Sequence, residues 1–381
     1  MMKSYRVASF NVENLLHPGV YYTGRDDSAP YDGALFDQKI RWIGSILDEA
    51  RADLVGFQEV FSYEAIKSAV AASRHLNGAM IVAPGIEAGE NIRPRAAGGM
   101  EASGPNLALA SRFPVLSAEA ITDFPATVNL TIPLELNGVV KSETKLNVHR
   151  FERPILKARV TLPGGVNATV LVAHLKSKRP KFLEGENPAD PVVQALGRIR
   201  SLIVRSMEAV ALRAIVVNIL DNLDGEVGEP LILFGDLNDD VSSVTTQTVA
   251  GEEPAQFLRP EIRRRDWDIQ LYSVHDLQEA LSYRDVSYTH IYNGRHELLD
   301  HIFVSQEFVR QFPQRLAIVA NTRIFNDHLL DKKWVVENDR PSIIIDGKRM
   351  WLPSLRSDHG VPVTEIEIVA PLSTQGEQTK G

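Results

Sequence analysis

The apolar residues of this sequence fall mainly in short runs that are rich in Val, Ile, Leu and Phe and are broken by Gly, Pro and Asp. Runs of this kind are typical of buried strands. Longer segments with a helical apolar period lie between some of them. The predicted strands are residues 5–10, 54–57, 107–110, 168–173, 230–234 and 301–304, and the predicted helices are residues 35–50, 63–76 and 192–223. This alternation predicts an α/β protein in which helices pack on the outer faces of sheets.

The third predicted helix has the clearest period. Its apolar positions are Leu196, Ile199, Leu202, Ile203, Met207, Val210 and Ala211. Because this spacing gathers them on one face of a helix, we expect that face to pack against a sheet.

No linker rich in Pro, Gly or Ser separates two self-contained patterns, so we expect one domain over residues 1–370. Long aperiodic segments interrupt it and are expected to form rim loops, since such loops in compact domains are commonly functional. The predicted insertions are residues 84–105, 123–149, 181–191, 240–265 and 320–356. Residues 371–381 are predicted to form a polar C-terminal tail.

Composition excludes several classes of protein. The sequence contains no Cys, which excludes disulfides, thiolate nucleophiles and Cys-ligated metal sites. The formal net charge of -8 argues against nucleic-acid binding through a general positive surface, but not against local basic patches. The N-terminus shows no apolar signal segment, and no stretch is long and apolar enough to span a bilayer. We therefore expect a cytoplasmic protein without a membrane span; its oligomeric state is not predicted by the sequence.

Polar side chains adjoin the predicted buried strands at five places. They are Asn11, Glu59 and His174 after three strands, Asp236 and Asn238 after a fourth, and Asp358 and His359 before the apolar residues 361–363. Strand ends in layered α/β proteins meet at one edge, where ligand sites form. The pattern predicts a functional site at that edge.

Taken alone, each residue has a simpler structural explanation. Glu59 suits the start of a helix, and Asp236 with Asn238 suits a turn after Gly235. His174 fits an exposed basic loop, and Asp358 fits a turn cap. None of these explanations accounts for five such places in one chain.

Hydrolysis of a phosphate ester gives these residue types a common purpose. It uses a hard divalent cation with oxygen ligands, a base for water, and donors for the phosphoryl charge. His359 is the predicted base, because the usual pKa of His lies near neutrality. Asp300 is the predicted carboxylate that orients it.

Seven segments in a fixed order give the sequence a strong resemblance to the endonuclease/exonuclease/phosphatase family, which includes DNase I-like nucleases. The resemblance covers nearly the whole chain. The segments are residues 9–14 (SFNVEN), 56–60 (GFQEV), 106–114 (NLALASRFP), 174–178 (HLKSK), 235–239 (GDLND), 299–305 (LDHIFVS) and 357–362 (SDHGVP).

The resemblance implies a four-layered α/β sandwich of the DNase I-like type, with two mixed β-sheets face to face, helices outside and an active site at one edge. It also implies one or two Mg²⁺ or Mn²⁺ ions. By similarity, Glu59 and Asn11 hold the principal ion with Asp358 nearby, while Asp236 and Asn238 lie by the attacking water and phosphate or bind a second ion. His359 and Asp300 activate water, and His174 stabilises the developing charge or helps to protonate the leaving oxygen.

Three further residues are predicted to bind substrate. Arg153 resembles a phosphate-binding Arg of DNase I-like nucleases, although a salt bridge with Glu152 is an alternative. Asn106 is expected to face the same edge. Lys176 begins a basic segment that either aligns a phosphate backbone or is a solvated loop. The chain departs from DNase I-like proteins in one respect, because no acidic partner for His174 can be identified.

The predicted function is divalent-metal-dependent hydrolysis of phosphodiester bonds, by a nuclease or another phosphodiesterase. The segment 287–301 looks like that of bacterial nuclease-like members, and the motifs of inositol 5-phosphatases are missing. The substrate is therefore a phosphate ester, with nucleic acid among the candidates. A phosphomonoesterase acting on a small metabolite or lipid headgroup is one alternative, and a non-catalytic binding module on the same fold is another.

Overall fold

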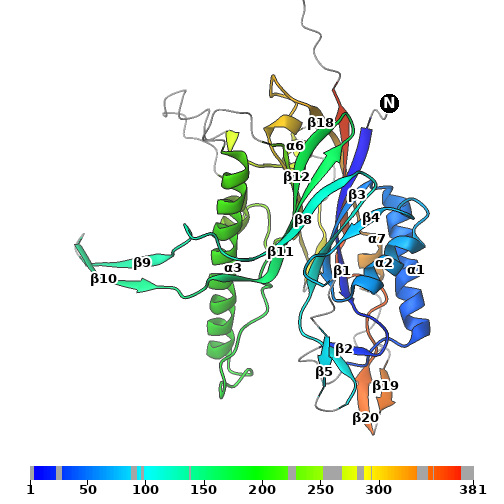
Figure 1. Cartoon of the computed structure of the whole chain (residues 1–381). Helices are drawn as coiled ribbons and strands as arrows, with labels where there is room; N and C mark the ends of the chain where they lie inside the picture. The colour runs from blue at the N-terminus through cyan, green and yellow to red at the C-terminus, as the bar shows by residue number, and fades with distance from the viewer. Residues whose placement is uncertain are drawn as a thin grey trace, which may run out of the picture.

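The computed structural model describes residues 4–22, 28–86, 92–95, 98–136, 139–221, 229–251, 268–280, 287–292, 294–332, 342–345 and 347–369. Two six-stranded sheets form the centre of the protein (Figure 1). In order across the first sheet lie β18 (Ala317–Phe325), β21 (Val361–Ile368), β1 (Ser4–Leu15), β3 (Leu54–Val60), β7 (Asn106–Ser111) and β4 (Met80–Val82). In order across the second lie β14 (Tyr272–Ser273), β17 (Asp300–Val304), β13 (Leu231–Asp236), β12 (Val166–His174), β11 (Arg150–Leu162) and β8 (Val115–Asp123). All six predicted strands are present, three in each sheet.

Both sheets are mixed, and their register aligns the ends of neighbouring strands. β1 runs parallel to β3, and Asn11 lies opposite Gln58. β12 runs parallel to β13, and His174 lies opposite Asp236. β17 runs antiparallel to β13 and begins where β13 ends, so that Asp300 lies opposite Asp236. The polar residues that follow the apolar runs are therefore gathered at one edge of each sheet.

The sheets pack face to face through an apolar core. Val7 and Leu54 of the first sheet belong to the same buried cluster as Val170 and Phe234 of the second. Gly56 in β3 permits this close approach, because a Cβ at its position would lie 2.8 Å from Cδ2 of Phe234. Close packing of this kind holds the two site-bearing edges at a fixed distance.

Helices cover the outer faces of both sheets. α1 (Gly33–Ala50) and α2 (Tyr63–Ala72) bury their apolar faces against the first sheet, and α3 (Pro191–Leu220) lies on the second. The helices begin at the N-caps Asp32, Ser62 and Asp190, whose side chains accept hydrogen bonds from backbone N–H groups of the first turn. The order helix, sheet, sheet, helix confirms the predicted four-layered sandwich.

The prediction for the apolar face of α3 is wrong over the N-terminal half of the helix. Leu196 is 47% exposed and Ile199 is 53% exposed, whereas Gly197 and Ser201 are buried. Only the C-terminal half, with residues such as Leu212, joins the core on the second sheet. Figure 1 shows the reason, because the N-terminal half of α3 extends past the strands that the rest of the helix covers.

Most of the predicted insertions contain small sheets or short helices of their own. Residues 84–105 contain β5 (Ile92–Pro94) and β6 (Met100–Ala102), which form a three-stranded sheet with β2 (Val20–Tyr22). Residues 123–149 contain the hairpin of β9 (Thr131–Leu136) and β10 (Val139–Lys145). Residues 181–191 form a connection that leads into α3. Residues 240–265 contain α4 (Val244–Ala250), and their part from 252 on lies outside the described residues, as does the predicted tail 371–381.

The predicted insertion 320–356 is wrong at its start, because β18 is a full edge strand of the first sheet and runs to Phe325. Its polar residues, including Asn321 and Thr322, break the apolar run that marks the other strands, as is usual at an edge. The rest of the segment contains α7 (Asp327–Lys332), β19 (Ser342–Ile345) and β20 (Lys348–Trp351).

Three remaining elements complete the described chain. They are α6 (Val274–Glu279), the 3₁₀ turn η1 (Gln306–Phe308), and the hairpin of β15 (His290–Tyr292) with β16 (Arg295–Glu297). Among the described helices, none combines the length and the apolar character needed to cross a membrane.

Candidate active site

The predicted site residues of the two sheets meet at the edge where β1, β3, β12 and β13 end, which is the lower end of the sheets in Figure 1. Asn11 links the sheets, because its Nδ2 donates to Oδ2 of Asp236 over 3.0 Å. Oδ1 of Asp236 accepts from the backbone N–H of Asn238 over 2.9 Å. Nε2 of His174 lies 3.4 Å from Oδ2 of Asp236. Asp236 is thus the centre of the cluster.

His359 and Asp300 form the predicted pair. Nδ1 of His359 lies 2.7 Å from Oδ2 of Asp300, and both side chains are buried. Nε2 of His359 lies 3.8 Å from Oδ2 of Asp236, so it faces the centre of the cluster. Burial by itself lowers the pKa of His359, but the carboxylates of Asp300 and Asp236 outweigh burial and raise that pKa well above its usual value. The carboxylates therefore favour a proton on this imidazole.

Two groups in the cluster have pKa values moved mainly by burial. Burial raises the pKa of Asp236 to about 7, with the charge of Asp300 adding to the effect. Burial lowers the pKa of His174 well below its usual value, and the nearby Arg153 acts in the same direction. Burial therefore disfavours the charged form of both groups.

The sequence offers no acidic partner for His174, and the described structure shows none at its Nδ1. Nδ1 of His174 is buried and has no hydrogen-bond partner among the described residues. Among the described residues, the carboxylate close to its ring is that of Asp236, on the other ring nitrogen. Because the register of β12 and β13 sets this contact, sequence spacing does not reveal it.

Glu59 lies at an irregularity in the first sheet. Its φ is 61°, and the pairing of β3 with β7 shifts register between Phe57 and Val60. Oε2 of Glu59 accepts from the backbone N–H of Asn14 over 2.9 Å, and Asn14 itself has a φ of 52°. Left-handed backbone at non-glycine residues is costly and collects at functional sites. Here it turns a carboxylate toward the end of β1.

The site offers the ligands that a divalent cation requires. Carboxylate oxygens from Glu59, Asp236 and Asp358 and the amide oxygen of Asn11 suit Mg²⁺ or Mn²⁺. Among the described residues, two sets of ligand atoms lie within 4.8 Å of one another. These sets are Asp236 with Asp300 and His359, and His290 with Asp358 and His359. Glu59 belongs to neither set, so its role as a metal ligand stays a prediction.

Lys176 is buried and Arg153 is partly buried, and both lie close to Glu152. Nη1 of Arg153 donates to the carbonyl oxygen of Leu175 over 3.2 Å and lies 4.0 Å from Oε2 of Glu152, while its Nε has no partner among the described residues. Nζ of Lys176 lies 3.7 Å from the same Oε2. The predicted alternative of a salt bridge between Arg153 and Glu152 is therefore present, but at the outer limit of distance.

The remaining basic residues of this segment are mostly paired. Lys178 lies 3.3 Å from Oε1 of Glu297 and 3.8 Å from Oδ1 of Asp239, and Lys181 contacts Glu152. These pairs reduce the positive charge that the segment presents to a polyanion.

Asn106 begins β7, opposite Val60 in the register and hence next to Glu59 along β3. A Cβ at Gly85 would lie 2.4 Å from Oδ1 of Asn106, so this amide occupies space that a larger residue would need. Asn106 therefore lies on the side of the site formed by the first sheet.

Several residues that position the site were not predicted. Ser357 donates to the carbonyl oxygen of Asn11 over 2.6 Å and accepts from the backbone N–H of His359 over 2.9 Å. Oγ1 of Thr289 accepts from the backbone N–H groups of Leu299 and Asp300. Ser357 and Thr289 thus hold the backbone of Asn11, His359 and Asp300 in place. The spacing of residues in the sequence does not predict contacts of this kind.

Two charged residues of α3 hold the loops of the second sheet. The carboxylate of Glu208 accepts from the backbone N–H of Glu152 over 2.8 Å and from that of Lys176 over 2.6 Å. Arg205 donates to the carbonyl oxygen of Lys176 over 3.1 Å and pairs with Asp239 over 3.0 Å. Burial raises the pKa of Glu208. The sequence did contain a signal for this positioning role, because Arg205 and Glu208 are two charged residues three positions apart in a mostly apolar helix.

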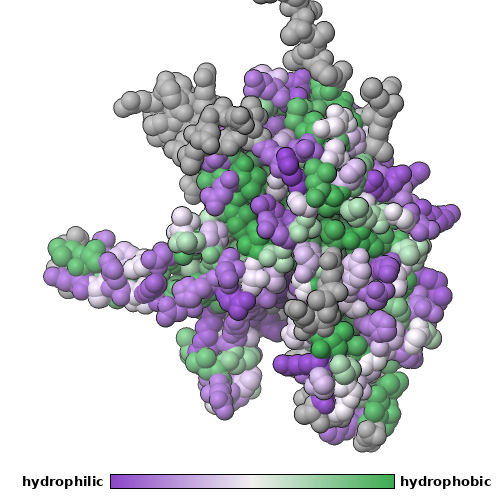
Figure 2. Space-filling view, in the orientation of Figure 1, coloured by the Kyte–Doolittle hydropathy of each residue, from purple (hydrophilic) through white to green (hydrophobic). Residues whose placement is uncertain are grey.

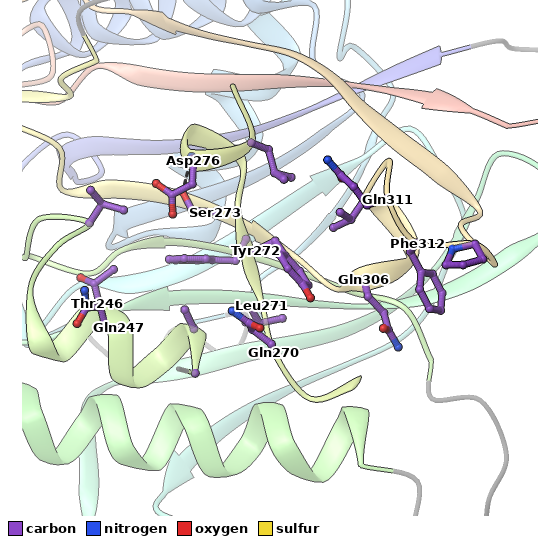
Figure 3. Close-up of a pocket in the computed structure, with 17 residues that line it drawn as sticks. Thr246, Gln247, Gln270, Leu271, Tyr272, Ser273, Asp276, Gln306, Gln311 and Phe312 are labelled. Carbon is purple, nitrogen blue, oxygen red and sulfur yellow. Dashed lines mark hydrogen bonds between the residues drawn. The ribbon is translucent and has the colours of Figure 1, made fainter. Parts of the chain in front are cut away.

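A hollow of about 820 Å³ lies elsewhere, on the outer side of the second sheet beside α4 and α6. Figure 3 shows Asp276 and Ser273 on one side of it and Gln306 and Phe312 on the other. Its lining includes Gly251 and Gln270, which flank residues 252–267, and those lie outside the described part of the chain. None of the predicted site residues lines it.

The fold is an α/β sandwich, and the cluster at its edge holds the residue types that hydrolysis of a phosphoester uses. The model of the Endonuclease/Exonuclease/phosphatase family matches residues 8–359. The chain belongs to this family, which confirms the resemblance described above. Comparison with curated proteins gives no match.

Solved structures are similar to the chain at low sequence identity. An endonuclease/exonuclease/phosphatase family protein from Bacteroides thetaiotaomicron is 15% identical with a TM-score of 0.50, and the match covers 96% of this chain and 98% of that one. A mannosyl-6-phosphatase of the same species is 15% identical with a TM-score of 0.48, over 96% and 100% of the two chains. The human Nocturnin catalytic domain with bound sulfate is 14% identical with a TM-score of 0.44, over 96% and 95%.

Proposed function

We propose that the protein is a divalent-metal-dependent phosphodiesterase whose active site is the edge formed by β1, β3, β12, β13 and β17. The observation that carries this proposal is the buried cluster in which His359 is bonded to Asp300 and faces Asp236, with Asn11 joining from the other sheet. A base, its orienting carboxylate and metal-capable oxygens are thereby within reach of one reacting phosphate.

In this proposal, His359 removes the proton from the attacking water through Nε2. Asp300 holds the opposite ring nitrogen, which fixes the orientation of the ring and stabilises the imidazolium that forms. The carboxylates of Asp300 and Asp236 raise the pKa of His359 and so strengthen it as a proton acceptor. A cation bound beside Asp236 would offset part of that negative charge and would leave the ring neutral before the reaction. A bound divalent cation supplies positive charge that neutralises the phosphoryl oxygens.

His174 and Arg153 stabilise charge on the other side of the phosphate. Neutral His174 offers an N–H to a phosphoryl or leaving oxygen, and its unpaired Nδ1 leaves either tautomer accessible. Arg153 approaches this region through its contact with the carbonyl oxygen of Leu175. Asn238 donates to the same carbonyl oxygen over 3.0 Å and keeps the turn after β13 in place.

The metal is assigned to Glu59, Asn11 and Asp358, with Asp236 and Asn238 beside the water and phosphate or around a second ion. Mg²⁺ and Mn²⁺ suit this oxygen-rich set. The proposal also treats residues 1–370 as one domain, in keeping with the family match across residues 8–359. The cytoplasmic location expected from the sequence stays a prediction.

A substrate panel tests the reaction. Hydrolysis of bis-p-nitrophenyl phosphate and of p-nitrophenyl phosphate is measured with Mg²⁺ or Mn²⁺, followed by plasmid DNA and RNA. We expect the diester to be the better substrate. A preference for the monoester would overturn the phosphodiesterase assignment in favour of a phosphomonoesterase. Absence of turnover across the panel, with metal still bound, would point instead to a non-catalytic binding module.

A further inference from the structure

In the N-terminal half of α3 the polar face is buried and the apolar face is exposed, the opposite of an ordinary surface helix. Gly197, Ser201, Arg205 and Glu208 are buried against the loops that follow β12. On the opposite face, Val192 is 67% exposed, as are Leu196 and Ile199 to about half. At 100° per residue, the two sets point in opposite directions. A face this apolar on a helix normally packs against another surface.

The hairpin of β9 and β10 has the same property. It pairs with neither central sheet, and Figure 1 shows it projecting away from the body of the protein beside α3. Its strands carry four exposed aliphatic side chains, Ile132, Leu134, Val139 and Val140. An isolated two-stranded hairpin is marginally stable in water, so a hairpin of this kind is expected to have a partner.

These two elements and the connection before α3 hold most of the exposed apolar side chains. Of the twenty large hydrophobic residues that are exposed in the described part of the chain, twelve lie here. They define the α3–hairpin surface, which consists of Ile132, Leu134, Val139, Val140, Phe182, Leu183, Val192, Leu196, Ile199, Leu202, Ile203 and Val210. Twelve half-exposed apolar side chains present on the order of 600 Å². That lies at the upper end of the roughly 300–600 Å² of the largest apolar patch on a typical monomer. Polar residues around it would bring the buried area toward the roughly 800 Å² per partner of a stable interface. Figure 2 shows apolar residues at the outer end of the hairpin.

We propose that the α3–hairpin surface is a self-association interface covered by a second copy of this chain. The chain carries two unpartnered apolar elements, and the hairpin points away from the body, so it does not cover its own helix. A two-fold arrangement lets the hairpin of each protomer lie over α3 of the other and satisfies both elements at once.

The charges on the hairpin favour a copy over an anionic surface. The exposed side chains of Glu135, Lys141, Glu143 and Lys145 carry two charges of each sign. Such a surface is electrically self-complementary and gives little attraction for a polyanion or an anionic membrane. The interface is also separate from the proposed active site, because the opposite face of α3 packs on the active-site loops.

Light scattering after size-exclusion chromatography tests the proposal. We expect the full chain to have twice the 42.3 kDa mass of one chain at micromolar concentration. The double variant Leu196→Glu/Ile199→Glu is expected to have the mass of one chain, and Leu134→Ser/Val140→Ser to weaken the dimer without placing charge on the helix. Ile344→Glu is the control, since Ile344 is 67% exposed on β19, outside this surface, and it should stay dimeric.

Cross-linking gives a second readout, because the chain has no Cys and an introduced one is unique. A mixture of Leu134→Cys and Ile199→Cys chains should form an intermolecular disulfide on mild oxidation, whereas a mixture with Ile344→Cys should not. A monomeric wild-type chain would overturn the proposal, and so would a dimer that both double variants leave intact. Binding of a monomer to phosphatidylcholine vesicles through Leu196 would also overturn it and assign the surface to a membrane.

Discussion

The active-site edge and the α3–hairpin surface depart from ordinary burial in opposite ways. At the edge, Asn11, Asp236 and Asp300 are almost completely buried although they are polar. On the α3–hairpin surface, Leu183 is 61% exposed and Ile199 is 53% exposed although they are apolar. The buried polar groups are mostly hydrogen-bonded to one another, whereas the exposed apolar groups have no packing partner in the described chain.

The difference separates two kinds of incomplete site. Buried polar groups cost free energy unless their hydrogen bonds are made. Among the described residues of the edge, atoms without such a bond include Nδ1 of His174, Oδ1 of Asp300 and Nε of Arg153, and they point to a polar ligand. Exposed aliphatic side chains call for an apolar cover. We therefore expect a small-molecule or ion partner at one place and, from the proposal above, a protein partner at the other. The first two of the following predictions test whether these two regions act independently, and the third tests a buried residue outside both.

The largest effect is expected from the base. His359→Ala should reduce kcat for the diester by between about 10²- and 10⁴-fold, because the attacking water loses its proton acceptor. Ile199→Glu is the matched control from the α3–hairpin surface and should keep kcat within about twofold, since Ile199 does not contact the site. A large loss of kcat in Ile199→Glu would show that the two regions are coupled and would contradict their independence.

A smaller effect is expected at the contact between α3 and the active-site loops. Glu208→Ala removes the acceptor for the backbone N–H groups of Glu152 and Lys176 and so loosens the segments that carry Arg153 and His174. We expect kcat to fall by about 10- to 100-fold with little change in KM, as is typical when catalytic groups shift slightly.

Glu208→Gln keeps an acceptor oxygen and should recover most of this activity. Hydrogen exchange of the backbone N–H groups of residues 152 and 176 provides a direct readout, with faster exchange expected in Glu208→Ala. Unchanged exchange together with full activity would show that Glu208 does not position the site.

A third prediction concerns the stability of the protein and tests His275, which lies outside both regions. Burial lowers the pKa of His275 to about 3, and the nearby His301 adds to this effect. Between about pH 6.5 and pH 3 the unfolded chain binds a proton at this residue that the folded chain does not, so stability falls as the pH drops. At pH 5 the loss from one such His is about 2 kcal/mol.

Urea unfolding at pH 7 and pH 5 measures this dependence. His275→Gln should reduce this pH dependence by about 2 kcal/mol. His149→Gln, at an exposed position, is the matched control. An equal slope in wild type and His275→Gln would refute a neutral, buried His275.

The sequence predicted the strands and the polar residues at their ends because both depend on local order. Short apolar runs identified three strands in each sheet, and the residues after them, such as Asn11 and Asp236, meet because parallel pairing aligns strand ends. The pairing of His359 with Asp300, expected from the family resemblance, agrees with the 2.7 Å contact.

The wrong predictions concern features that tertiary packing determines. The apolar period of α3 continues past the end of the sheet, so its N-terminal half, with Leu196, has nothing beneath it. β18 escaped notice because an edge strand tolerates polar residues such as Asn321. The role of Lys176 in substrate binding stays a prediction, but its burial and its pairing with Glu152 depend on contacts that no spacing in the sequence encodes.

The most direct test of the proposed active site is the dependence of bis-p-nitrophenyl phosphate hydrolysis on Mn²⁺ and Mg²⁺ after treatment with EDTA, in wild type and in Glu59→Gln. We predict no turnover in EDTA, saturable recovery with either ion in wild type, and a tenfold or greater increase in the metal concentration needed by Glu59→Gln, because a carboxylate ligand is lost. Full turnover in EDTA, or an identical metal dependence in the two proteins, would contradict the account.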